Sequence, residues 1–271
     1  MAFTFHEFSP GVTHIQDAMG VCMTLLTGAD RALLVDTGYG TEDVYAFVRT
    51  LTDLPLTVLL THGHHDHALG ARWFDEVYLL PKDNNVYWTY TAQEQRKMVL
   101  QSAREKGVPV DEQAFLSADM PRPRAIAPGD EDLGGLTARI ISCPGHTPGS
   151  AVVYVPEREL LLTGDDWNPC TWLFFPEALC VQDYRRNMRK VLKLPFGSVL
   201  CSHQHKLFSR FLLDQFLEYL SDECLSAAPP VDTGKGRGIM TAEARLPMDQ
   251  ILVFDKAKYE ANRGKGTEDD G

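Results

Sequence analysis

The sequence predicts an α/β protein in which two sheets pack together and helices cover their outer faces. Short apolar runs typical of strands alternate with longer segments of helical periodicity along most of the chain. The strands fall into two strand-rich halves, and each half also carries helices. A chain of 271 residues that is 44% hydrophobic can bury a large core, and α/β folds of this size often form one domain.

The first half opens with three predicted strands and a helix. Apolar runs bounded by turn residues predict the strands, and Thr27-Gly28-Ala29-Asp30 predicts a hairpin turn between two of them. The strands are expected at 12–16, 20–27 and 31–35, and the helix at 41–53. The next run, 56–60, is nearly all apolar, which is typical of a strand buried on both faces.

A helical insertion at about 83–135 separates the two halves. A short strand at 76–80 leads into a helical stretch at 83–106, and the Pro- and Gly-rich segment 117–135 predicts a loop or boundary. Further strands are expected at 136–142, 151–155, 159–163 and 198–202, helices at 181–193 and 207–226, and a strand or hairpin at 237–254. We expect one domain over residues 1–264 and a disordered tail at 265–271.

Charge and composition exclude several kinds of partner. The net charge of −11 and the lack of a basic patch argue against nucleic acid, since that binding depends on clustered Lys and Arg. No stretch approaches the length of a membrane span, and no basic-apolar leader opens the chain, so a cytoplasmic protein is expected.

The apolar segment 248–254 predicts a strand that completes its own sheet or, as the less favoured alternative, pairs between subunits of a homodimer.

The segment Thr61-His62-Gly63-His64-His65-Asp66-His67 follows the buried strand 56–60 and has the spacing HxHxDH. Imidazole and carboxylate are the ligands that a hydrolytic divalent metal prefers, and so dense a cluster is costly without a bound cation. Open α/β sheets place their ligands beyond the carboxyl ends of their strands. The segment therefore predicts a metal-binding loop.

Three more metal-capable side chains follow predicted strands in the second half. His146 lies in a Pro/Gly turn after one strand, Asp165 follows the strand at 159–163, and His203 follows the strand at 198–202. Taken singly, such residues are more often loop and turn residues than ligands. Together with HxHxDH, they predict that four strand ends deliver His or Asp to one rim.

Five motifs in this order resemble the metallo-β-lactamase superfamily. They are Val35-Asp36-Thr37-Gly38, the HxHxDH loop, Gly145-His146-Thr147-Pro148-Gly149-Ser150, Thr163-Gly164-Asp165 and the late His203, and they cover about residues 12–210. The resemblance implies a four-layer αββα sandwich with a dinuclear metal site on its edge. Nitrogen and oxygen ligands without thiolate suit zinc first, and also iron or manganese.

The resemblance also implies a role for each residue. His62, His64 and His146 would hold one metal, and Asp66, His67 and His203 the other, with Asp165 bridging. Asp36 would brace the HxHxDH loop by accepting hydrogen bonds, and His65 would point away. Ser202 stands where the family usually has Gly, and both His203 and His205 follow it. The strand end favours His203 as the ligand, which leaves His205 next to the ligands or facing the pocket.

The implied chemistry is hydrolysis of a small-molecule substrate. Two cations about 3.5–4 Å apart lower the pKa of a shared water toward about 7, and the resulting hydroxide attacks a small ester, lactone or thioester. Asp66 is the candidate catalytic residue, as a proton shuttle. The alternatives are a β-lactam or phosphodiester hydrolase on the same site, or a non-catalytic metal-bound scaffold or sensor.

Substrate contacts are expected in the aromatic segment 166–176. Trp167, Asn168, Trp172 and Phe174 follow the bridging Asp165 and predict either a pocket wall or local core packing. Homoserine-lactone lactonases carry Tyr at the position of Asn168, and the basic glutathione-binding residues of glyoxalase II cannot be located. The diiron electron-transfer members have Glu in place of His64, which argues against a redox role.

Overall fold

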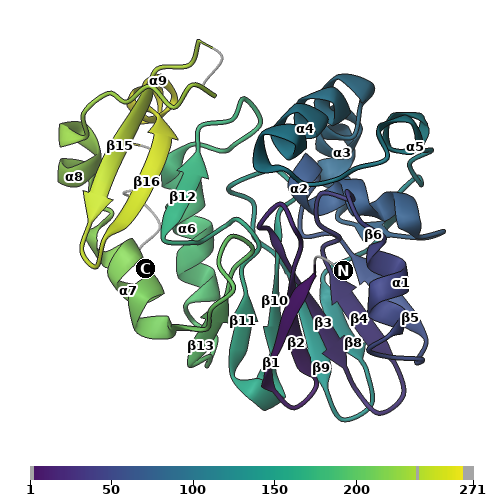
Figure 1. The fold of residues 1–271 in the computed structure, drawn as a ribbon. Coiled ribbons are helices and arrows are strands. Elements are labelled where there is room, and N and C mark those ends of the chain that lie inside the picture. Colours follow the sequence, from purple (N-terminus) through teal and green to yellow (C-terminus); the bar gives the residue numbers. More distant parts are fainter. Residues whose placement is uncertain (1–2, 236–237, 265–271) are drawn as a thin grey trace.

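Two large sheets lie face to face at the centre of the computed structural model, which describes residues 3–235 and 238–264 (Figure 1). The predicted tail 265–271 lies outside the described residues. The first sheet has the strand order β1-β2-β3-β4-β5-β6-β7. Its strands are β1 (Thr4–Ser9), β2 (Val12–Gln16), β3 (Cys22–Thr27), β4 (Ala32–Val35), β5 (Leu56–Leu59), β6 (Tyr78–Leu79) and β7 (Arg124–Ala125).

The second sheet has the order β14-β13-β11-β10-β9-β8. Its strands are β8 (Gly129–Asp132), β9 (Thr137–Ser142), β10 (Ala151–Val155), β11 (Leu160–Leu162), β13 (Ser198–Leu200) and β14 (Phe208–Ser209). Because β9 and β11 both pair antiparallel with β10, and β13 pairs parallel with β11, the strands β9, β11 and β13 all end at the same edge.

An apolar layer fills the space between the two sheets. Val12, Leu33 and Leu59 of the first sheet meet Ile140, Val153 and other residues of the second in one buried cluster. β10, whose five residues are all buried, reads Ala-Val-Val-Tyr-Val, as expected for a central strand covered on both faces. This layer confirms the predicted pairing of two sheets and fixes the relative position of their strand ends.

Helices cover the outer faces, which completes the four layers of an αββα sandwich (Figure 1). On the first sheet, α1 (Val44–Arg49) packs Val44 and Val48 against buried strand residues such as Leu34. On the second, α6 (Val181–Val191) and α7 (Arg210–Tyr219) contribute Tyr184, Met188 and Phe216 to another cluster. The helix predicted over 207–226 is in fact β14, α7 and α8 (Asp222–Ala227).

A third, smaller sheet lies next to the sandwich. It has the order β12-β16-β15, with β12 at Cys170–Leu173, β15 at Thr241–Leu246 and β16 at Gln250–Asp255, followed by α9 (Lys256–Ala261). The strand or hairpin predicted over 237–254 is its β15–β16 hairpin, whereas β12 and the separate sheet were not predicted. β16 pairs on one side with β12 and on the other with β15. The apolar segment 248–254 therefore completes a sheet of its own chain and has no free edge for a partner.

The predicted helical insertion contains α3 (Asn84–Tyr90), α4 (Gln93–Lys106) and α5 (Glu112–Ser117). The predicted stretch 83–106 is broken at Thr91–Ala92, and α4 ends at Gly107, whose φ of 69° favours glycine. Segment 117–135, predicted as loop or boundary, also holds β7 of the first sheet and β8 of the second. No helix in residues 3–235 and 238–264 has both the length and the apolar character needed to cross a membrane.

Candidate metal centre

Four strand ends bring the metal-capable side chains to one edge of the sandwich. After β5 the chain passes through His62 and His64 into the short helix α2 (His65–Ala68). The segments after β9, β11 and β13 supply His146, Asp165 and His203. Two groups result: His62, His64 and His146 form the first group, and Asp66, His67, Asp165 and His203 form the second group, each with potential ligand atoms within 4.8 Å of one another.

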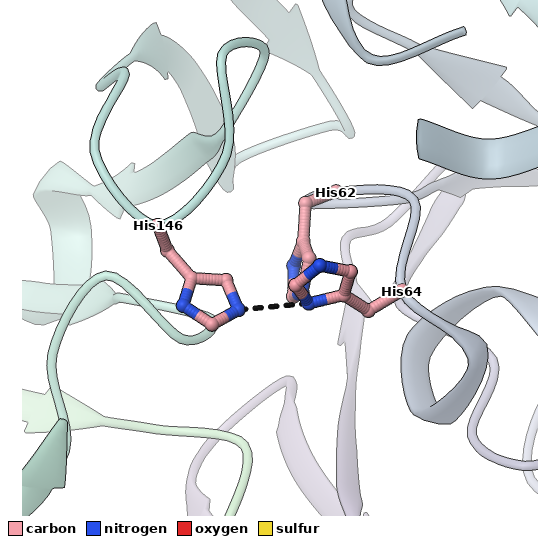
Figure 2. A group of neighbouring side chains, drawn as sticks. All are labelled: His62, His64 and His146. Atoms are coloured by element: carbon pink, nitrogen blue, oxygen red, sulfur yellow. Dashed lines mark hydrogen bonds between the residues drawn. The ribbon is translucent and has the colours of Figure 1, made fainter. Parts of the chain in front are cut away.

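The three imidazoles of the first group face a common point (Figure 2). His64 Nδ1 and His146 Nε2 lie 2.9 Å apart, and the ring of His62 is 4.7 Å from that of His64 and 4.8 Å from that of His146. All three side chains are buried. In each ring, the nitrogen that faces away from the other two imidazoles lies within hydrogen-bonding distance of a protein oxygen. These pairs are His62 Nδ1 with Thr61 Oγ1 at 3.0 Å, His64 Nε2 with Glu177 Oε1 at 2.6 Å, and His146 Nδ1 with the Trp172 carbonyl at 2.7 Å.

The second group gathers around the carboxylate of Asp165. Its Oδ2 lies 2.9 Å from His203 Nε2 and 3.4 Å from His67 Nε2. The same oxygen lies 3.7 Å from His146 Nε2 of the first group. Asp66 Oδ2 lies 3.6 Å from His203 Nε2 and 3.7 Å from His67 Nε2. Asp165 therefore stands between the two groups.

Several buried atoms of this centre have no hydrogen-bond partner in the described structure. They are His62 Nε2, His67 Nε2 and Asp165 Oδ1, all buried. Buried polar atoms are nearly always satisfied in folded proteins, because leaving one unpaired costs about 1–3 kcal/mol. Converging nitrogen and oxygen donors with unpaired buried atoms among them fit a pair of divalent cations.

Burial and the neighbouring histidines lower the pKa of two imidazoles of the first group. Burial lowers the pKa of His62 well below its usual value, and the neighbouring histidines lower it further. Burial, together with the charge of His64, lowers the pKa of His146 to about 4. A neutral imidazole has a lone pair free for a metal, so at neutral pH these two rings are in the metal-binding form.

Asp66 is held in its anionic form. Burial raises the pKa of Asp66, but the facing imidazoles of His67, His65 and His203 outweigh burial and lower the pKa to about 2. His65 itself belongs to neither group; its ring lies 5.6 Å from that of Tyr39 and stacks at 5.9 Å on that of Tyr90.

Two buried carboxylates tie the ligand loops to the fold. Asp36, in the turn after β4, accepts hydrogen bonds from the Thr61 backbone N–H at 2.7 Å and from His67 Nδ1 at 2.9 Å. Asp83, just before α3, accepts from the Gly63 N–H at 2.6 Å and from the Gly149 N–H at 2.7 Å. Asp36 orients a candidate ligand directly, whereas Asp83 joins the HxHxDH loop to the turn that carries His146.

His205 and three aromatic-segment residues do not reach the metal-ligand groups. His205 Nε2 donates to the His14 carbonyl at 3.0 Å. Trp167 and Phe174 are both fully buried. Trp167 lies in a core cluster, and its Nε1 donates to Gln250 Oε1 at 3.2 Å. Asn168 Oδ1 accepts from the Cys170 N–H in a local turn. For Trp167 and Phe174, core packing is thus the alternative that the structure favours over a pocket wall.

Trp172 is the partly exposed one of the four predicted pocket residues. Three residues beside His64 are not among the predicted site residues. The ring of Phe175 lies 4.9 Å from that of His64, the ring of Tyr90 lies 4.3 Å from it, and the two aromatic rings are 6.5 Å apart. Glu177 hydrogen-bonds to His64, as described above. Glu177 and Asp83 lie in no sequence motif that indicates a role. For Tyr90 and Phe175, the one available signal was that each lies in a run of aromatic residues.

Several curated proteins are similar to part of this chain. A probable metallo-hydrolase of Bacillus subtilis (strain 168) is 27% identical over 146 residues, 52% of this chain and 63% of the relative. An acyl-coenzyme A thioesterase of Gallus gallus is 27% identical over 191 residues, 63% and 66% of the two chains. A hydroxyacylglutathione hydrolase of Bartonella tribocorum is 29% identical over 152 residues, 55% and 49%. The match thus spans from about half to two thirds of each relative.

Solved structures share the fold at lower identity. A stereoselective inverting sec-alkylsulfatase from Pseudomonas sp. superposes with a TM-score of 0.62 at 16% identity, over 82% of this chain and 42% of that chain. A beta-lactamase domain protein from Burkholderia ambifaria gives 0.60 at 22% identity, over 82% and 74%. A protein solved in a di-iron-bound form gives 0.54 at 24% identity, over 72% and 92%.

The family model described as the metallo-beta-lactamase superfamily matches residues 18–166, more than half of the chain. The matched segment includes Asp36, the HxHxDH loop, His146 and Asp165, so it contains all but one of the side chains in the two groups. His203 lies beyond the match, at the end of β13 in the same sheet edge. With its αββα sandwich and its paired ligand groups, this chain belongs to the metallo-beta-lactamase superfamily.

Proposed function

We propose that this protein is a dinuclear metal-dependent hydrolase that acts on a small ester, lactone or thioester. The observation that carries the proposal is the placement of Asp165 Oδ2 within 3.4 Å of His67 Nε2 and 3.7 Å of His146 Nε2. One carboxylate thereby faces both ligand groups, as a bridging ligand must. The first group would hold one cation and the second group the other.

The chemistry divides between the bound ions and the protein. When bound, two divalent cations supply Lewis acidity and lower the pKa of water toward about 7. The chain's own residues hold the ligand atoms in place, and the anionic Asp66, whose Oδ2 lies 3.6 Å from His203 Nε2, would accept a proton. Zinc is the proposed metal because the donors are nitrogen and oxygen, and iron or manganese are the alternatives.

The surroundings of the centre support a thioester among these substrates. The rings of Phe175 and Tyr90 lie next to each other beside His64 and offer an apolar wall for an acyl group. Lys235 Nζ lies 4.7 Å from the centre of the partly exposed Trp172 ring, which places a positive charge next to the same wall. An apolar wall with a positive charge next to it suits a substrate in which an acyl group is attached to a negatively charged carrier. One of the similar curated proteins is named an acyl-coenzyme A thioesterase.

Metal content and a substrate panel test the proposal together. We expect two equivalents of metal per chain and hydrolysis of at least one member of a panel of activated esters, lactones, thioesters, β-lactams and phosphodiesters. His64→Ala and Asp165→Ala should each lower kcat/KM by about 100-fold or more, because each removes several kcal/mol of transition-state stabilisation. His6→Ala is the matched control, since His6 is exposed on β1.

Two outcomes contradict the proposal. Protein that binds fewer than two metals after reconstitution would exclude a dinuclear centre. Protein that binds two metals and is inert toward the whole panel would favour a metal-bound scaffold or sensor.

A further inference from the structure

Glu177 lies next to the candidate metal centre, in the segment between β12 and α6, and has no role in the family motifs. Its Oε1 accepts a hydrogen bond from His64 Nε2 at 2.6 Å. The other nitrogen of that ring, Nδ1, points into the first group and lies 2.9 Å from His146 Nε2. Glu177 is therefore on the far side of the His64 ring from the point where the three imidazoles meet.

This geometry favours one tautomer of His64. A neutral imidazole has one N–H and one lone pair, so the ring can bind a metal through Nδ1 only if the proton is on Nε2. A carboxylate is a pure acceptor and favours that proton position. Thr61 and the Trp172 carbonyl meet the outer nitrogens of His62 and His146, so among the three rings only His64 uses a charged acceptor.

The segment that carries Glu177 is held by the C-terminal part of the chain. Lys258 Nζ, in α9, donates to the Ala178 carbonyl at 2.7 Å and to the Pro176 carbonyl at 3.1 Å. The Leu179 N–H donates to the Gly145 carbonyl at 2.9 Å, one residue before His146. The Tyr90 side chain also hydrogen-bonds to Glu177.

Two other roles for Glu177 fit the contacts less well. Glu177 is not itself one of the first-group ligands, because its carboxylate oxygens do not lie with the three imidazole nitrogens in the group defined by mutual ligand distances. It is also not an ordinary surface ion pair, since its side chain is 17% exposed and that of His64 is 4% exposed. A residue that positions His64 must place a hydrogen-bond acceptor against one nitrogen of the ring, and the Glu177 carboxylate does so at Nε2.

We propose that Glu177 is a positioning residue that fixes His64 with Nδ1 toward the first metal, and that Lys258 of α9 keeps Glu177 in place. The inference rests on the proposed metal centre. With these roles for Glu177 and Lys258, the third sheet and α9 help to hold the metal ligands in place, although both lie outside the residues matched by the family model.

The first experiment measures zinc affinity rather than turnover. Metal-free wild type, Glu177→Ala and Glu177→Gln are titrated with Zn²⁺ in competition with a chromophoric chelator, which resolves the two binding steps. We expect Glu177→Ala to weaken one step by about 10–100-fold and to leave the other within about twofold. Glu177→Gln should lose less, because its amide oxygen can still accept the His64 N–H.

Controls separate a positioning effect from lost stability. Glu94→Ala removes an exposed glutamate from α4 and should leave both steps unchanged. Lys258→Met should weaken the same step as Glu177→Ala, whereas Lys82→Met, an exposed lysine, should not. Urea unfolding of each metal-free variant reports whether the fold itself has been weakened.

The outcomes distinguish this inference from the proposed function. Wild type that fails to bind two zinc ions overturns the dinuclear centre itself. Wild type that binds two, with Glu177→Ala equal to it at both steps, overturns the positioning role alone. Equal weakening of both steps, in proportion to lost unfolding free energy, likewise contradicts the role, because it shows a general structural effect.

Discussion

His14 is a buried histidine on β2 that belongs to no ligand group. Its Nδ1 meets Thr24 Oγ1 at 2.9 Å, and its Nε2 has no partner in the described structure. Its ring lies 5.4 Å from that of His205. Burial, and next the positive charge of His205, lower the pKa of His14 from 6.5 to about 4. The folded protein therefore holds this ring neutral at pH values where an unfolded chain would protonate it.

This shift predicts a loss of stability in mild acid. Between pH 6.5 and pH 4 the unfolded chain binds a proton at His14 and the folded chain does not, so the free energy of unfolding falls as the pH falls. The full effect is about 3 kcal/mol for a shift of this size. Urea unfolding of wild type and His14→Phe across this range measures it. Wild type should lose more stability than the variant, and parallel curves would contradict the assignment.

At the residue scale, the sequence predicted the candidate metal ligands better than the residues that hold those ligands in place. His62, His64, His146, Asp165 and His203 follow strands and sit in motifs, so their order and placement were readable. Glu177 and Asp83 act through contacts with segments 113 and 66 residues away, His64 and Gly149. Only the folded chain brings such distant partners together, and neither residue type is unusual in a loop.

At the element scale, Asp83 links the two ligand loops. Each carboxylate oxygen accepts one backbone N–H, from Gly63 of the HxHxDH loop and from Gly149 of the turn that carries His146. A Cβ on Gly63 would come within 2.3 Å of the Tyr87 backbone nitrogen, and one on Gly149 within 2.5 Å of that of Asp83. The glycines thus allow a close approach, which explains why both loops can share one acceptor.

We expect Asp83→Asn to destabilise the protein by about 1–3 kcal/mol, because the amide group can accept only one of the two buried N–H groups and leaves the other unpaired. Urea unfolding of the metal-free protein measures the change, since the two hydrogen bonds do not involve a metal. Asp75→Asn is the matched control on an exposed loop residue and should stay within about 0.5 kcal/mol. Equal stability of both variants would show that the two loops do not depend on Asp83.

The predicted elements were most accurate where periodicity was strong. The strand at 151–155 agrees residue for residue with β10, and 12–16 agrees with β2. β12 was missed because Cys170–Leu173 is short and follows Asn168 and Pro169, which read as a turn. Its strand conformation comes from pairing with β16, about 80 residues later. Tertiary pairing of this kind leaves no local signal.

At the scale of the whole molecule, the layer between the sheets determines where the two ligand groups meet. The HxHxDH loop follows β5 of the first sheet, whereas His146, Asp165 and His203 follow strands of the second sheet. The side chains of one sheet reach those of the other only because the sheets are docked face to face. Packing of the apolar layer between the sheets is therefore required both for bringing the two ligand groups together and for the stability of the fold.

Leu33 tests that dependence because it is fully buried on β4 within the inter-sheet cluster. We expect Leu33→Ala to lower the free energy of unfolding by about 2–5 kcal/mol, through lost apolar burial and the cavity left behind. Leu207→Ala is the matched control, since Leu207 is 39% exposed, and it should change stability by less than about 0.5 kcal/mol. Chemical unfolding monitored by tryptophan fluorescence measures both, and equal changes would show that the layer between the sheets does not carry the stability assigned to it.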